Sequence, residues 1–254
     1  MHYKTITTTI IDFIIDEVKK RKSKGLVIGL SGGLDSSVAA TLAVRALGSG
    51  KVFGLILPEF NITPKSDVDD AQELAKDLKI KHKVIEITMG KRVFLKQLPK
   101  NKLAQGNFTA RLRMCLIYYY ATLLNRLVLG ASDKSEIKLG YYTKHGDGAA
   151  DILPIADLYK TEVREMAKFL KINPVISNKI SSPRLWKDHT AEREIGMPYE
   201  EIDEILRLLD NNNIIKNTSK SYSKTKINRI LQLAEKNKHK QEMPAICSLD
   251  KYRS

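Results

Sequence analysis

The first half of the chain alternates short apolar runs with longer segments whose apolar residues recur at helical spacing. This spacing, with apolar residues three and four positions apart, predicts helices at 6–20, 36–48 and 63–80. Short, continuously apolar runs predict strands buried on both faces at 26–30, 52–58 and 83–87. The resulting β–α–β–α–β order with short connections predicts an α/β fold built on a doubly wound parallel sheet with right-handed crossovers. The helix at 63–80 is expected to start with Thr63 as N-cap and Pro64 at its first position.

The second half continues the pattern but contains longer polar segments. The helix expected at 108–127 is apolar around most of its circumference, which favours either a central core helix or a homodimer interface. A fourth strand is predicted at 127–132, followed by a polar, glycine-rich stretch at 133–151 that ends near a short strand at Ile152–Ile155. The remaining pattern predicts a helix at 160–171, a long loop at 180–198, helices near 199–210 and 222–236, and an irregular tail.

Composition narrows the class of protein. With 254 residues, of which 43% are hydrophobic, the chain can bury a core, and no linker divides residues 1–254 into more than one domain. No apolar stretch reaches the roughly 18 residues of a membrane span, and the start lacks a signal peptide's layout, so a cytoplasmic protein is expected. The only cysteines, Cys115 and Cys247, form no CxxC pair, which argues against a disulfide scaffold or a cysteine-built metal site.

The formal charge of +14 favours polyanions as partners in general. It does not decide between nucleic acid and phosphorylated metabolites, and it is equally consistent with a lysine-rich surface that is merely well solvated.

The most informative segment is LVIGLSGGLDSSV at 26–38, where a predicted strand passes through a glycine turn into a helix. A P-loop would need a lysine where the chain has Asp35, and the glycines do not have the GxGxxG spacing of a dinucleotide fingerprint. The residues Gly29–Gly33 do match GxSxG, the nucleophile elbow of α/β hydrolases. That elbow follows several strands, however, whereas only one helix fits before Leu26.

A phosphate-binding turn explains the segment better. Backbone amides in a strand-to-helix turn and the positive end of the following helix bind phosphate oxygens. Gly32 and Gly33 allow close approach, Ser31 and Ser36 add hydroxyl groups, and Asp35 can hold a divalent cation against the same phosphates.

GLSGGLDSS resembles the SGGxDS signature of the N-type ATP pyrophosphatases, a Rossmann-like superfamily that cleaves ATP to AMP and diphosphate while adenylating an acceptor. Within that superfamily, the segments at 107–114, 127–170 and 181–196 and the tail HKQEMP resemble the ammonia-dependent NAD synthetases, and the resemblance covers nearly the whole chain. It implies that deamido-NAD (nicotinic acid adenine dinucleotide), ATP and ammonia are converted through an acyl-adenylate into NAD, AMP and diphosphate. Glutamine-dependent relatives carry an additional glutaminase domain, for which no segment of this chain is left over.

The resemblance also implies roles for individual residues. Asp35 and Glu136 are expected to bind Mg²⁺ and, together with Lys160, to form the catalytic set. Lys160 would donate to the ATP phosphates and stabilise the leaving diphosphate. The expected ATP contacts are Gly29, Leu30, Ser31, Gly32, Gly33, Leu34, Asp35, Ser36, Ala131, Lys160 and Ser182. The expected deamido-NAD contacts are Arg111, Lys144, Asp151, His239 and Lys240.

Some positions depart from the family pattern. Ala131-Ser132-Asp133 stands where the family commonly has Thr-Gly-Asn, which removes a hydroxyl contact to ATP. SPRLW replaces the more usual SAGLW and places Pro183 and Arg184 in the loop over the nucleotide, and Gln241 and Ala245 alter the tail motif. His145 and His189 match no family role. For Trp186 three roles are left open: closing over the site, stacking on a ring, or packing as an ordinary core residue.

The expected protein is therefore a homodimeric enzyme that acts on small molecules, with neither a nucleic-acid nor a membrane partner. Two alternatives remain: a tRNA-modifying adenylating enzyme of the same superfamily, and a nucleic-acid-binding protein that keeps the fold without catalysis. The first would suit the positive charge, but the two cysteines form no sulfur relay. The second would show steep salt-dependent RNA binding without ATP turnover.

Overall fold

Among the described residues, four parallel strands form the centre of the molecule, and each lies at or near a predicted position. The computed structural model describes residues 1–210 and 222–249. The strands lie in the order β3-β2-β1-β4 and are β1 (Leu26–Gly29), β2 (Val52–Ile56), β3 (Lys81–Val84) and β4 (Leu127–Leu129). The chain moves outward from β1 through β2 to β3 and then returns to the other side of β1 for β4. This reversal is the doubly wound topology that the pattern of elements predicted.

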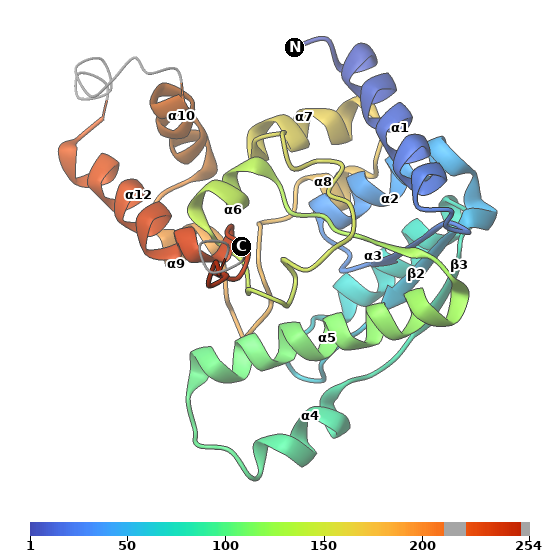
Figure 1. The fold of residues 1–254 in the computed structure, drawn as a ribbon, viewed down its shortest axis with the longest axis horizontal. Helices are drawn as coiled ribbons and strands as arrows, with labels where there is room; N and C mark the ends of the chain where they lie inside the picture. Colours follow the sequence, from blue (N-terminus) through green and yellow to red (C-terminus); the bar gives the residue numbers. More distant parts are fainter. Residues whose placement is uncertain (211–221, 250–254) are drawn as a thin grey trace.

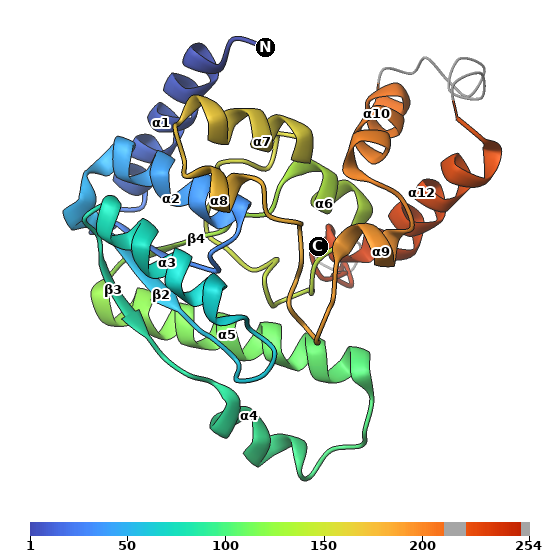
Figure 2. The same cartoon turned by 180° about the vertical axis from the view of Figure 1, so that it is seen from behind.

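The helices cover both faces of this sheet and extend beyond it (Figures 1 and 2). None of the described helices combines the length and the apolarity that a bilayer crossing needs. In chain order the described helices are α1 (Tyr3–Lys20), α2 (Leu34–Leu47), α3 (Lys65–Asp77), α4 (Thr88–Leu95), α5 (Lys102–Leu124), α6 (Lys134–Leu139), α7 (Lys160–Phe169), α8 (Pro174–Ser177), α9 (Ala191–Ile195), α10 (Tyr199–Asp210) and α12 (Lys224–Asn237), with 3₁₀ turns η1 (Ser49–Lys51) and η2 (Lys238–Lys240).

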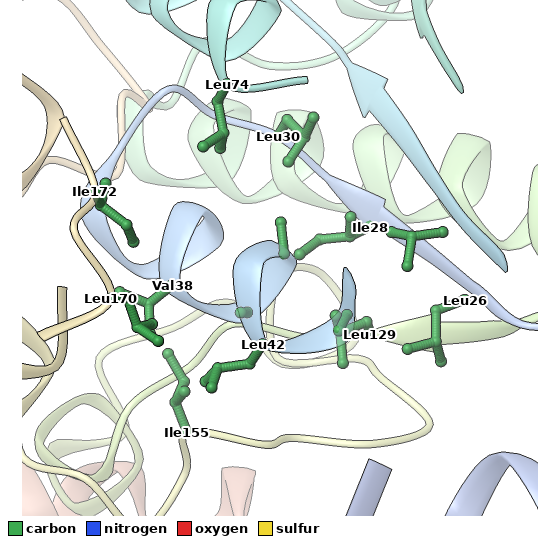
Figure 3. Close-up of a cluster of buried hydrophobic side chains, with 14 of the residues drawn as sticks. Leu26, Ile28, Leu30, Val38, Leu42, Leu74, Leu129, Ile155, Leu170 and Ile172 are labelled. Carbon is green, nitrogen blue, oxygen red and sulfur yellow. The ribbon is translucent and has the colours of Figure 1, made fainter. Parts of the chain in front are cut away.

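Alternation along β1 divides the core between the two faces of the sheet. Leu26 and Ile28 point to one face, where they pack with side chains of α1, α2, α3 and α7. Figure 3 shows this cluster around α2, with Leu42 beside Ile155. Val27 points to the opposite face and packs with α5. Because both faces of β1 are covered, its apolar run is continuous rather than alternating.

A second apolar cluster lies beside the sheet. It joins α6, α9, α10 and α12 around side chains such as Tyr199, Ile202 and Ile230, each at most 1% exposed. Figures 1 and 2 show α9, α10 and α12 grouped on the side away from β3. The amphipathic patterns predicted near 199–210 and 222–236 are thus explained by packing against one another and against α6.

Helix α5 differs from its prediction in both its start and its environment. It begins at Lys102 rather than near residue 108, because the Asn101 side chain accepts a hydrogen bond from the Ala104 amide and caps it. One side of α5 packs on β1 and β4, while Tyr119 and Leu123 on another side are 64% and 63% exposed. The prediction that this segment is a central core helix is therefore wrong within a single chain. The alternative, that it forms part of a homodimer interface, stays a prediction.

Several shorter predictions also need correction. Thr63 is not the N-cap of α3: its hydroxyl accepts from the Glu59 amide, and Pro64 takes the cap position. The segment near Ile152 forms only a single parallel bridge to Leu129 instead of a strand. The strand predicted at 83–87 is β3, which ends at Val84. The polar stretch predicted at 133–151 contains α6, and the loop predicted at 180–198 contains α9. Helices α4 and α8 were not predicted. Helices of four to eight residues complete too few turns for a hydrophobic period to be recognised. Both cysteines are free and exposed. In the tail, residues 250–254 lie outside the described part of the chain.

Candidate active site

The site lies where the direction of strand order reverses. β1 pairs with β2 on one side and with β4 on the other. The segments that follow the carboxyl ends of β1 and β4 therefore start side by side and then separate. In open parallel sheets this crevice is where ligands bind. The glycine turn at 29–36 follows β1, and the segment 130–136 follows β4. The topology therefore brings together the two sequence segments that were predicted to hold ATP and a metal ion.

The glycine turn is held by its own hydroxyl groups. The Ser31 and Ser36 hydroxyl oxygens are 3.0 Å apart, the Gly33 amide donates to Ser31 Oγ, and the Ser37 hydroxyl donates to the Gly33 carbonyl. Gly32 has φ +71, in the left-handed region. The turn leads directly into α2, so its backbone lies at the positive end of a helix dipole.

Gly32 is required for two independent reasons, and Gly32→Ala is expected to lower the free energy of unfolding by about 2–4 kcal/mol. A Cβ there would lie 2.0 Å from the Asp67 carbonyl oxygen, and an alanine would also be strained at the positive φ. Thermal and urea unfolding measure the change. Gly50→Ala is the matched control, because a Cβ at Gly50 meets nothing within 4 Å. Equal stability of the two variants would contradict this account of the turn.

Two carboxylates come from the start of α6. Asp133 is the N-cap: its Oδ1 accepts a hydrogen bond of 2.8 Å from the Glu136 amide, and the Glu136 side chain accepts from the Asp133 amide. This reciprocal capping box satisfies two amides at the helix end. It also places the two carboxyl groups side by side at the end of α6.

The third carboxylate is Asp35, in the first turn of α2, and all three surround the ammonium group of Lys160. Lys160 Nζ lies 2.8 Å from Asp35 Oδ2, 2.6 Å from Asp133 Oδ2 and 3.0 Å from Glu136 Oε1. The Lys160 side chain is completely buried, as is that of Asp133, whereas about a fifth of the Asp35 and Glu136 side chains is exposed. Asp35 and Glu136 thus form the outer layer of the cluster, and Lys160 and Asp133 the inner one.

The position of Lys160 depends on contacts between the starts of α6 and α7. The Lys160 amide donates to the Ser135 hydroxyl at 2.9 Å, and that hydroxyl donates to Asp203 of α10. Asp203 also accepts from the Thr161 amide at 2.8 Å. The centroid of the buried Tyr199 ring lies 5.2 Å from Lys160 Nζ. The face of this ring takes the place of part of the water that normally surrounds an ammonium group.

The pKa values in this cluster follow from burial and charge. Burial raises the pKa of the Asp133 carboxyl to about 6, against the opposing charge of Lys160. Burial, and after it the charge of Asp133, raises the pKa of Glu136 well above its usual range. Burial alone would lower the pKa of the Lys160 ammonium, but the charges of Asp133, Asp35 and Glu136 outweigh it and raise that pKa well above the ordinary value. Lys160 therefore stays charged, while the carboxyl groups favour additional positive charge.

These residues fit a divalent cation. One ligand oxygen from each of Asp35, Asp133 and Glu136 can be chosen so that all lie within 4.8 Å of one another. When all three carboxyl groups are ionised, the single ammonium of Lys160 leaves two negative charges uncompensated. Asp35 Oδ1 is also buried without a hydrogen-bond partner among the described residues. Carboxylate oxygens are the ligands that Mg²⁺ prefers.

A cavity of about 760 Å³ opens beside the cluster. This volume is within the usual range for sites that hold small molecules and cofactors. Of the predicted site residues, it is lined by Gly29, Leu30, Ser31, Asp35, Ser36, Ala131, Glu136, Ser182 and Lys240. Gly33 and Leu34 line a smaller adjoining cavity, and Lys160 lies behind the carboxylates instead of at the surface of either cavity. The glycine turn and the two expected metal ligands are thus brought together, as predicted.

The loop 180–190 forms another wall of the large cavity. Ser182 closes the loop by donating its hydroxyl hydrogen to the His189 carbonyl. The rings of Trp186 and His189 stack with centroids 3.7 Å apart, and both residues line the cavity. His189 Nε2 lies 2.7 Å from a carboxylate oxygen of Glu194. Trp186 is therefore part of the cavity wall, and His189, which had no assigned role, supports it.

The predicted deamido-NAD residues are less concentrated. The Arg111 guanidinium donates to the Lys144 carbonyl at 3.2 Å, and Lys144 Nζ donates to the His239 carbonyl, so these three are linked. Lys240 Nζ donates to the carbonyls of Gly140 and Tyr142. Asp151 accepts from the Val128 amide at 2.6 Å and so extends the edge of β4. Of these five residues, only Lys240 lines the large cavity.

Asp133 is the member of the carboxylate cluster that sequence reasoning missed. It was noted only as a departure from the family pattern at 131–133, although it supplies a third carboxylate within 2.6 Å of Lys160. The signal was present in the sequence, because an aspartate three residues before a glutamate at a helix start is the capping-box pattern.

The fold and the site together define a Rossmann-like, ATP-dependent ligase that acts on small molecules. A model of the NAD synthase family matches residues 6–244, and the chain belongs to this family. This membership separates the chain from the tRNA-modifying enzymes of the superfamily that were considered as an alternative.

Individual relatives agree with the family match. The chain is 44% identical over 247 residues to the NH3-dependent NAD+ synthetase of Archaeoglobus fulgidus, covering 97% of each chain. Among solved structures, it resembles the NH3-dependent NAD synthetase of Campylobacter jejuni with TM-score 0.85 and 37% identity, covering 98% of this chain and 100% of the other. It also resembles an NMN synthetase of Francisella tularensis with TM-score 0.86 and 36% identity, covering 98% and 99% of the two chains.

Proposed function

We propose that this chain amidates deamido-NAD with ammonia, at the expense of ATP, to form NAD, AMP and diphosphate. The observation that carries the proposal is the carboxylate cluster around Lys160, which adjoins both the glycine turn and a cavity large enough for a nucleotide. A phosphate-binding turn next to acidic groups suits a nucleotide that carries its own divalent cation.

The chain's residues divide the reaction between them. The amides of the glycine turn hold the phosphates, Asp35 and Glu136 with Asp133 beside them would hold Mg²⁺, and Lys160 keeps these carboxylates in place. A bound Mg²⁺ would supply positive charge against the phosphate oxygens. The substrate carboxylate attacks the α-phosphorus, the bond from that phosphorus to the bridging oxygen breaks, and diphosphate leaves. Ammonia then attacks the acyl carbon of the adenylate, AMP leaves, and the nitrogen loses a proton to give the amide.

For deamido-NAD itself, the proposed contacts are Arg111, Lys144, Asp151, His239 and Lys240. The linkage of Arg111, Lys144 and His239 supports a common role for these three. Cationic side chains suit a dinucleotide, because guanidinium binds phosphate with two parallel hydrogen bonds and lysine acts as a point charge. Ser182 and Ala131 line the cavity as proposed ATP contacts, Ala131 through its backbone only.

A homodimer is part of the proposal. Helices α4 and α5 lie together at one edge of the molecule (Figure 1). Both carry exposed apolar side chains. Met89, Phe94, Leu103, Tyr119 and Leu123 are each more than half exposed. Apolar surface of this extent is typical of a protein–protein interface. The reaction is proposed to take place in the cytoplasm.

Leu123→Glu is expected to convert the dimer to a monomer, because it buries an unpaired carboxylate in the interface and costs about 2–4 kcal/mol of association free energy. Light scattering coupled to gel filtration measures the mass. Val175→Glu is the control, since Val175 is 61% exposed on α8, away from α4 and α5. If the Leu123→Glu variant has the same mass as a dimeric wild type, the interface lies elsewhere on the surface. If the wild type is itself a monomer, the proposal of a homodimer is wrong.

A second candidate substrate is a mononucleotide. It is favoured by one observation, the likeness to a solved structure that is named an NMN synthetase. The chemistry would be the same amidation of a nicotinate carboxylate, without the second nucleotide. Parallel assays with nicotinic acid mononucleotide and with deamido-NAD decide between the two by the ratio of kcat/KM.

The test of the proposed function is a product assay with deamido-NAD, ATP, MgCl₂ and ammonium chloride. Equal amounts of NAD, AMP and diphosphate are expected, and chelation of Mg²⁺ with EDTA is expected to stop the reaction until Mg²⁺ is restored. ADP as the nucleotide product would rule out adenylation. RNA binding that falls steeply with salt, without any ATP turnover, would favour the non-catalytic alternative.

A further inference from the structure

A second, smaller cavity adjoins the glycine turn. Its volume is about 70 Å³, and it lies between the turn and the start of the loop 179–184. Ser31, Asp35, Ser182 and Arg184 line both this cavity and the large one, so the two are neighbours. Residues of the turn (Ser31, Gly33, Leu34 and Asp35) line this small cavity together with two cationic residues, Lys179 and Arg184.

The two cations differ in what they have left to bind. Lys179 Nζ donates to the Gly32 carbonyl at 2.9 Å and to Asp67 Oδ1 at 2.8 Å, and also pairs with Asp70. Lys179 thus makes two hydrogen bonds, and its charge is compensated by two carboxylates, those of Asp67 and Asp70. Arg184 donates only through Nε, at 2.8 Å to Asp67 Oδ2, among the described residues. Its two terminal nitrogens, with four N–H bonds, remain available.

Asp67 pairs with both cations, and Lys179 also contacts the turn. It is 4% exposed, in the first turn of α3, and its carbonyl oxygen lies directly against Gly32. A carboxylate that engages Nε orients the guanidinium plane and leaves the edge with the terminal nitrogens for another acceptor. That edge matches two oxygens of a phosphate group.

The backbone of Arg184 supports a role for its side chain. Arg184 has φ +50, a left-handed conformation that costs a residue with a Cβ about 1–2 kcal/mol and that glycine adopts freely. An unfavourable residue at a cavity wall is the kind of backbone outlier that points to function.

We propose that Arg184, oriented by Asp67, binds the terminal phosphates of ATP in the small cavity and retains contact with the diphosphate as it leaves. Arg184 and residues of the glycine turn line this same cavity, so both can contact one diphosphate group. The inference rests on the proposed function in one respect, namely that the glycine turn binds the triphosphate.

Arg184→Gly tests the proposal, because it removes the guanidinium and at the same time relieves the backbone. The melting temperature is expected to stay close to that of wild type, since Lys179 still pairs with Asp67. The Kd for inorganic pyrophosphate, measured by titration calorimetry with Mg²⁺ present, is expected to rise about tenfold or more, equal to the loss of roughly 1.4 kcal/mol. The KM for ATP should rise similarly, while the KM for deamido-NAD stays within about twofold.

Two further variants complete the experiment. Arg193→Ala is the control, because Arg193 is an exposed arginine of α9 that lines neither cavity. Arg184→Asn serves if the glycine variant does not fold, because asparagine tolerates the left-handed conformation. A folded Arg184 variant with unchanged pyrophosphate affinity and unchanged KM for ATP would overturn the proposal.

The outcome also separates this inference from the proposed function. If wild type forms NAD but the Arg184 variant binds pyrophosphate normally, the inference fails and the function stands. If wild type binds pyrophosphate through Arg184 but forms no NAD, the function fails and the phosphate site stands.

Discussion

Replacing Asp35 with asparagine is expected to lower kcat/KM for ATP by about a thousandfold while the protein remains folded. The asparagine keeps the size of the side chain and one acceptor oxygen, but it removes the charge of a proposed metal ligand, which is one of the three carboxylates that surround Lys160. A steady-state assay of AMP formation measures the loss, and raising the Mg²⁺ concentration should recover only part of it. Circular dichroism and thermal unfolding report whether the fold is kept.

Asp69→Asn is the matched control for this variant. Asp69 is an acid of α3 whose one ion pair among the described residues is with the exposed Lys65, so its charge lies on the surface. Its replacement is expected to change activity by less than about twofold, since exposed ion pairs contribute little. An Asp35→Asn enzyme that keeps more than a tenth of the wild-type activity would show that Asp35 holds no essential cation.

Replacing Lys160 with methionine is expected to have the largest effect on stability, lowering the free energy of unfolding by about 3–5 kcal/mol. Methionine fills a similar volume but leaves three carboxylates within a few ångström of one another without their counter-charge. For a chain of this size the melting temperature should fall by about 10 °C. Urea unfolding in the presence of EDTA measures the change without any contribution from bound divalent cations.

Two variants test the electrostatic origin of that loss. Lys134→Met is the control, because Lys134 pairs with the 96% exposed side chain of Asp157, and its loss should cost less than about 1 kcal/mol. The double change of Lys160→Met with Asp133→Asn should be more stable than Lys160→Met alone, because it removes one of the repelling charges. Lys160 and Lys134 variants of equal stability would mean that Lys160 does not compensate the cluster.

The elements that carry the nucleotide site could be predicted from the sequence because their signals are local. The glycine turn is contiguous, and its conformation depends on Gly32 and on serine hydroxyls within a few residues of it. The strands of the sheet were recognised because burial on both faces requires continuous apolar runs. Glu136 and Lys160 were selected through a resemblance, and the structure then placed both beside Asp35.

Other features could not be read from local sequence. The loop 180–198 lacks a hydrophobic period, so nothing in it indicated that Arg184 would bind Asp67, which is 117 positions away. The contact between Ser135 and Asp203, which positions the start of α7, joins residues 68 positions apart. The environment of α5 also depends on what covers its outer side, which a single chain does not supply.

The sequence by itself determined the order of the four strands and of the longer helices, the glycine turn that we propose to bind phosphate, and the family of the protein. These features depend on periodicity, on recognisable motifs and on hydrogen bonds between near neighbours. Only the tertiary structure decided that Asp133 completes the acidic cluster, that Lys160 is buried behind its carboxylates, and that Arg184 pairs with Asp67 beside the turn. The physical reason is that burial and charge compensation act through space. They arise when segments far apart in the chain exclude water from the same point.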